Sequence, residues 1–100
     1  MTAEFSQIGG VRIGPGLIAF NATWPFARFT VTNSELRLSC FFQDWTFPRA
    51  SIRRLSRHEG ISTGLRIEHT IKGYNPFIVF WTFKFAGLKK ELEARGYDVS

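Results

Sequence analysis

The chain has 100 residues, of which 44% are apolar and 16% aromatic, and a formal net charge of +5. This length allows one domain with its own core, and the apolar fraction excludes the polar, charge-rich composition of disordered chains. The positive charge favours encounters with anionic partners but specifies none of them.

The first residues, 1–6, have neither the basic head nor the apolar stretch of a signal peptide. Two strands are expected next, over Gln7–Ile13 and Leu17–Ala22, separated by the Gly-Pro-Gly turn at residues 14–16. The longest apolar run, Phe77–Phe83, is far too short to cross a bilayer. We therefore expect a cytoplasmic protein without a transmembrane segment.

A period of two dominates the following segment. Arg28–Thr32 and Glu35–Cys40 alternate polar and apolar side chains on either side of the turn-like Asn33-Ser34. This pattern predicts a hairpin with one buried face. After a further turn at Gln43-Asp44, a short strand is expected over Trp45–Phe47.

Three more strands are expected before the end of the chain. Ile52–His58 carries little apolar material and several arginines, as is typical of a sheet edge. Leu65–Lys72 shows the clearest alternation of the chain. Phe77–Phe83 is apolar on both parities, so this strand should be central and covered on both faces.

One amphipathic helix is expected over Phe85–Arg95, with an uncertain start because no capping residue precedes it. Its apolar stripe should pack on the Phe77–Phe83 strand through Phe85, Leu88 and Leu92. Glu91 can pair with Arg95 four residues later, and Gly96 supplies a stop.

Several segments in this order resemble the pleckstrin-homology-like superfold, especially its bacterial and GRAM-type members. They are Phe29–Leu38, Trp45–Leu55, Gly64–Glu68, the aromatic strand and the final helix. The resemblance covers residues 17–97 and implies a bent antiparallel sheet, or two nearly orthogonal sheets, capped by the C-terminal helix. It also implies a module that binds lipid headgroups, peptides or other copies of itself. The basic loop of phosphoinositide-binding members has no counterpart at Ile13–Leu17, where only Arg12 is nearby.

Four arginines form the densest basic cluster of the chain, at Arg49, Arg53, Arg54 and Arg57. Guanidinium groups bind phosphate bidentately, so this cluster is a candidate site for an anionic lipid surface or a phosphate. On a strand, however, successive side chains point to opposite faces, which favours a solvated edge that resists aggregation.

A candidate protein-interaction surface comes from aromatic residues expected in connecting segments or at turns. Its members are Trp24, Phe26, Phe41 and Trp45, with Pro25 between the first two. Exposed rings of this kind are typical anchors of a partner or self-association surface. The alternative, that they close the ends of a small barrel, stays open.

We expect no catalytic residues, no metal and no cofactor. His69 shares the parity of buried residues, which predicts a buried, hydrogen-bonded imidazole, and His58 should face solvent. Cys40 is the only cysteine, which excludes an intramolecular disulfide, and its neighbours Phe41 and Phe42 predict a buried thiol. No motif for nucleophilic, phosphate-binding or metal chemistry is present in the sequence.

The sequence therefore predicts a mainly β single domain of pleckstrin-homology-like type. We expect non-catalytic binding of a protein partner or self-association. The alternative is peripheral binding to an anionic membrane surface through the arginine cluster. Aromatic residues at core parity leave no stacking platform, which disfavours nucleic acid.

Overall fold

The computed structural model describes residues 4–14, 20–60 and 63–100. Most of the strand expected over Leu17–Ala22 lies outside the described residues. The elements are β1 (Phe5–Ile13), β2 (Phe20–Val31), β3 (Glu35–Cys40), β4 (Gln43–Pro48), the 3-10 helix η1 (Arg49–Ser51), β5 (Ile52–Glu59), β6 (Thr63–His69), β7 (Ile78–Trp81) and α1 (Phe85–Ala94).

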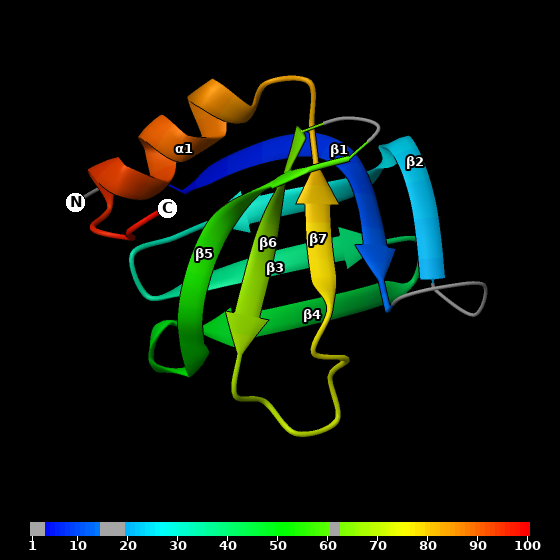
Figure 1. Cartoon of the computed structure of the whole chain (residues 1–100), viewed down its shortest axis with the longest axis horizontal. Coiled ribbons are helices and arrows are strands. Elements are labelled where there is room, and N and C mark those ends of the chain that lie inside the picture. Colours follow the sequence, from blue (N-terminus) through cyan, green and yellow to red (C-terminus); the bar gives the residue numbers. More distant parts are fainter. Residues whose placement is uncertain (1–3, 15–19, 61–62) are drawn as a thin grey trace.

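The seven strands form one antiparallel sheet in the order β4-β3-β2-β1-β7-β6-β5. The sheet curls into a half-barrel, and α1 lies along one open end (Figure 1). In this view β3 and β4 lie behind β6 and β7 and run across their direction. This confirms the expected mainly β fold with a bent sheet and a C-terminal helix. β5 and β4 are the two edge strands, as predicted for β5.

The inner face of the curled sheet holds the core. Phe29 of β2 stacks on Phe80 of β7 with ring centroids 5.1 Å apart, and both side chains are fully buried. In the predicted hairpin, Leu36 and Leu38 point into the same cluster, while Arg37 between them is half-buried on the outer face. The period of two therefore places the core residues correctly here.

The centre of the sheet depends on a close approach between β1 and β7. A Cβ atom on Gly9 would meet Cζ of Phe80 at 2.7 Å, and one on Gly10 would overlap the indole of Trp81, both on β7. Side chains at these positions would separate the strands, so glycine is required for the pairing.

Helix α1 begins at Phe85, as predicted, and buries Leu88 and Leu92 in the core. It lies closest to β6, one strand away from the expected β7, because the inner side of β7 is occupied by the Phe29–Phe80 stack. Within the described ranges, no helix has the length and apolar character needed to span a membrane.

The predicted helix stop is also confirmed. Gly96 has a φ of 85° and donates its N–H to the carbonyl of Glu93 at 3.0 Å, and the N–H of Tyr97 reaches the carbonyl of Leu92 at 3.0 Å. These two bonds form the Schellman arrangement that ends a helix. The Glu91–Arg95 ion pair is present at 2.8 Å.

Two strands are shorter than expected. β6 ends at His69 because its Nδ1 accepts the N–H of Ile71 at 3.0 Å, which takes that donor out of the ladder. β7 ends at Trp81 because the hydroxyl of Thr82 accepts the N–H of Lys84 at 3.1 Å and turns the chain toward α1. Phe83 consequently lies outside the strand and is exposed.

Candidate functional site

Aromatic side chains gather on the outer face of the sheet, which points away from the core. Trp24 and Phe26 lie within β2, so the expectation of a connecting segment is wrong. β1 pairs with β2 on both sides of this stretch, and the register shift leaves residues 23–26 without partners in β1. This bulge exposes 50% of Trp24 and 54% of Phe26.

Phe26 stacks on Phe41, with ring centroids 5.6 Å apart and an interplanar angle of 24°. Phe41 and Phe42 form the tight turn between β3 and β4, and Phe42 is fully exposed. The rings of Phe26 and Phe41 border a hollow of about 250 Å³, which Ile8 and Arg28 also line. We call this feature the Phe26 hollow.

The backbone of Phe41 is in the left-handed region, with a φ of 55°. Tight hairpin turns place Gly, Asn or Asp in this region because a larger side chain meets its own backbone there. An aromatic residue at this position is therefore strained, by about 1–2 kcal/mol. Its ring is also exposed, so the core does not compensate for the strain.

A larger groove of about 630 Å³ lies over the outer face of β7. Its apolar lining includes Val79, Trp81 and Phe83, and its polar lining includes Arg12 and His58. We call this feature the Trp81 groove. Trp24 is linked to it through Phe83, because the two ring centroids are 6.1 Å apart.

Trp45 does not join these outer rings. It pairs with Leu38 in the β3–β4 register, and it packs against the core from the inner face of β4. Of the proposed interaction residues, the structure thus brings Phe26 and Phe41 together and places Trp24 against Phe83, at the Trp81 groove. Trp45 is directed to the core.

The four candidate arginines are dispersed. Arg49 donates to the carbonyls of Asn33 at 2.7 Å and Arg95 at 2.9 Å, and its guanidinium lies 4.2 Å from the ring centroid of Tyr97. Arg53 is exposed at the register shift of β5. Arg49 is therefore used by the fold, away from the others.

Arg54 and Arg57 make separate contacts on β5. The Nε of Arg54 donates to the hydroxyl of Ser100 at 3.3 Å. Arg57 forms an ion pair with Glu59 at 2.6 Å and lies over the ring of Phe85. The geometry does not gather these guanidinium groups around one anion.

The histidines and the cysteine have structural contacts. His69 is half-buried, accepts the N–H of Ile71 at Nδ1, and contacts the carbonyl of Asn75 through Nε2 at 2.9 Å, so Nε2 carries the proton. His58 is half-buried against the ring of Phe77 and lines the Trp81 groove, contrary to its expected solvent position.

The Cys40 side chain is buried, as predicted, and burial raises the pKa of its thiol. No group of three metal-ligating side chains occurs in the described residues.

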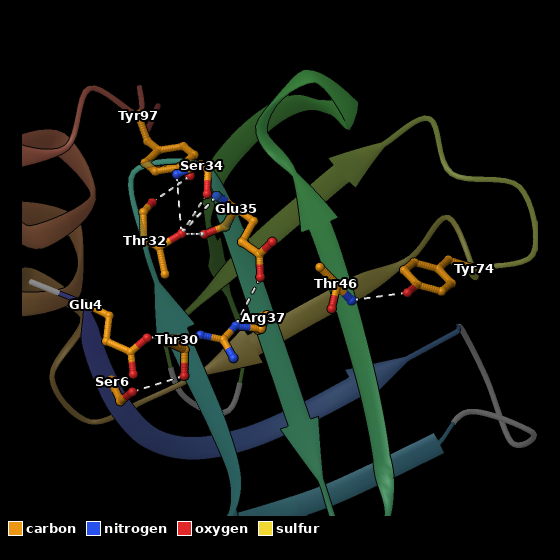
Figure 2. Close-up of polar contacts among 10 residues, drawn as sticks. All are labelled: Glu4, Ser6, Thr30, Thr32, Ser34, Glu35, Arg37, Thr46, Tyr74 and Tyr97. Carbon is orange, nitrogen blue, oxygen red and sulfur yellow. Dashed lines mark hydrogen bonds and ion pairs between the residues drawn. The ribbon is translucent and has the colours of Figure 1, made fainter.

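Both sheet edges are blocked, β4 by a side chain and β5 by the segment 99–100. The N–H of Thr46 on β4 donates to the Tyr74 hydroxyl at 3.1 Å (Figure 2). Pro48, the last residue of β4, has no N–H. On β5, Ser100 donates to the carbonyl of Leu55 at 2.9 Å and accepts the N–H of Arg57 at 3.0 Å. A partner strand would have to displace these contacts, so the outer face is the better docking surface.

Sequence reasoning missed Arg12, Phe42, Trp81 and Phe83 as parts of an exposed site. One signal was present, because Phe77–Phe83 is apolar on both parities and only one helix was available to cover it. The structure uses that helix on the inner side of the sheet and leaves the groove on the outer side.

Comparisons with protein-family models, with curated proteins and with solved structures found no match for this chain.

Proposed function

We propose that this chain is a non-catalytic module of pleckstrin-homology-like type that self-associates through the Phe26 hollow and the β3–β4 turn. The curled sheet with its terminal helix supports the choice of superfold. The observation that carries the function is the strained, exposed Phe41, stacked on Phe26 next to a fully exposed Phe42.

The turn sequence is poor for stability and good for docking. A two-residue hairpin turn folds best with Gly, Asn or Asp at a position of positive φ. Here the turn residues are Phe41 and Phe42, and both are exposed, although Phe26 stacks on one face of the Phe41 ring. Strained backbone conformations that no core contact compensates are concentrated at functional sites in proteins.

The chain carries both halves of a self-complementary contact. Phe42 projects from the turn as an unsupported apolar ring, and the Phe26 hollow beside it is open and partly apolar. In a two-fold dimer each turn can insert into the hollow of the other copy, so one pair of features makes the contact twice. Arg28 lines the hollow and can lie over the face of an inserted ring.

Light scattering over a concentration series tests this proposal. The mass should rise from the 11.5 kDa of one chain toward twice that value. Added salt should not reduce association, because the contact is apolar and salt screens the repulsion between two chains of charge +5. Phe42→Ser should keep the protein monomeric over the same range, since it removes the inserted ring without disturbing a buried contact.

Phe83→Ser is the matched control, because it removes another exposed Phe ring that lies outside the hollow. Its mass should follow that of the unmodified chain. Phe41→Asn is a second disrupting variant, since Asn suits the left-handed turn and should keep the fold while weakening association. A constant mass of 11.5 kDa for the unmodified chain at every concentration would reject self-association.

A further inference from the structure

We propose that the Trp81 groove binds a small organic carboxylate with a flat apolar body. This goes beyond self-association, because the groove and the Phe26 hollow are separate features. The carboxylate would lie at Arg12 and the apolar body over Trp81.

The groove lies over the outer side of β7, which is apolar: Val79 is buried there by neighbouring side chains and Trp81 is half-buried. Ile78 and Phe80 fill the core, while Val79 and Trp81 point to the opposite face. None of the described helices or strands forms a second layer there, since α1 lies on the inner side. A volume of about 630 Å³ lies within the usual range of roughly 300–1,000 Å³ for small-molecule sites.

Two glycines keep the floor of the groove low. A Cβ atom on Gly64 of β6 would lie 2.8 Å from Cγ1 of Val79, and the indole of Trp81 lies directly over Gly10 of β1. Glycine on both neighbouring strands therefore lets the indole lie against the sheet. The result is a broad apolar floor for a planar ligand.

The aromatic wall has a matching shape. Phe83 stands edge-on to Trp81, with ring centroids 6.3 Å apart and an interplanar angle of 81°. A flat ring placed on Trp81 would meet Phe83 at its side, in the edge-to-face geometry that aromatic pairs prefer. This arrangement favours a ring system over a long, flexible chain.

The charge at the other end selects an anion. Among the residues that the structure describes, Arg12 makes one polar contact, a 3.3 Å hydrogen bond from Nη1 to the side-chain oxygen of Asn21, which engages one of its five donors. Among the described residues that line the groove, none is acidic. By contrast, Arg37 on the outer face of β3 is ion-paired with Glu4 at 3.0 Å and Glu35 at 3.2 Å.

A single carboxylate suits this end of the groove best. A guanidinium offers two parallel donors that match the two carboxylate oxygens, and one negative charge balances one positive charge. A phosphate monoester carries nearly twice that charge, and the described groove provides one guanidinium. His58 and Thr23 add polar groups to the groove lining.

Isothermal titration calorimetry with naphthalene-2-carboxylate and naphthalene-2-carboxamide tests the proposal, because the two probes share a ring system and differ in charge. The carboxylate should bind at least about tenfold more tightly than the amide. Arg12→Gln should abolish this preference, and Arg12→Lys should retain part of it. Arg53→Gln is the matched control, since it removes the same charge from an exposed side chain outside the groove.

Phe83→Ser should weaken the binding of both probes by a similar factor, because it removes the apolar wall. Phe42→Ser should leave the affinities for both probes unchanged, because Phe42 lies outside the groove. Probe binding therefore tests this proposal independently of self-association. Equal affinity for acid and amide would overturn the proposal. The proposal would also be overturned if millimolar probe gave no heat of binding, or if Arg12→Gln and Arg53→Gln changed the affinity for the carboxylate equally. The thermal midpoint of every variant should be unchanged, which checks that each one is folded.

Discussion

Arg49 and Tyr97 join three parts of the chain through one set of polar contacts. Arg49 reaches the carbonyls of Asn33 and Arg95, and the Tyr97 hydroxyl donates to the carbonyl of Thr32 at 2.8 Å. The hydroxyl of Thr32 accepts the N–H of Glu35 at 3.0 Å, which closes the β2–β3 turn (Figure 2). The sequence singled out Arg49 for its charge, but its role depends on a ring 48 positions later, which no local pattern reveals.

Tyr97 should make stability depend on alkaline pH. Burial raises the pKa of its hydroxyl above the ordinary value of 10.0, and the nearby Arg49 guanidinium opposes part of this rise. The unfolded chain therefore loses the proton first, so the contribution to stability is complete below pH 10.0 and is lost as the pH rises through the folded pKa. Urea unfolding at a series of pH values measures this loss.

Tyr97→Phe is the control for that titration. It should reduce the free energy of unfolding near pH 7 by about 1 kcal/mol, because the bond to Thr32 is lost. It should also flatten the decline above pH 10, since the titrating group is absent. An equally steep decline in the variant would assign the effect to other groups.

At the level of single elements, the sequence predicts well where neighbouring residues decide the structure. The Arg28–Cys40 hairpin follows from its period of two, and the end of α1 follows from Gly96. The two ends of β7, by contrast, could not be predicted from neighbouring residues in the sequence. Thr82 donates its hydroxyl to Gln7 at 2.7 Å across the sheet, and this contact joins residues 75 positions apart.

The Trp81 groove escaped prediction for the same reason. Its floor needs Gly10 under an indole from β7 and Gly64 on the other side. In the sequence, Gly10 reads only as a weak strand position, and Gly64 reads as the end of a turn. The bulge that exposes Trp24 and Phe26 likewise depends on the register between two strands.

Leu92→Ala tests the packing of α1 on the curled sheet. The side chain is fully buried, so the substitution should lower the free energy of unfolding by about 2–5 kcal/mol through lost burial and a residual cavity. Chemical denaturation measures the change. Lys90→Ala, on the exposed face of the same helix, should change stability by less than about 0.5 kcal/mol. Similar values for the two variants would contradict the placement of the helix.

At the scale of the whole molecule, β1 is the strand that holds the sheet together. It pairs with β2 on one side and with β7 on the other, so it joins β2–β4 to β5–β7. The outer-face features depend on this joint, because the Phe26 hollow and the Trp81 groove both include residues of β1. A change that opens the β1–β7 pairing should therefore affect the complete fold.

Gly9→Ala should produce such a change. The added methyl would lie 2.7 Å from Cζ of the fully buried Phe80 and would press on the backbone oxygen of Trp81, and neither can move without opening the pairing. We expect a loss of about 2–3 kcal/mol, because overpacking of a filled site typically has this effect. The thermal midpoint should fall by roughly 10 °C, with coincident transitions in far- and near-UV circular dichroism if the two halves unfold together.

Gly87→Ala is the matched control, since nothing lies within 4 Å of that site on α1, and it should raise stability by about 0.5–1 kcal/mol. Separate transitions in the Gly9 variant would show that β1 does not couple the halves, and an unchanged midpoint would show that the close approach of β1 to β7 is not needed.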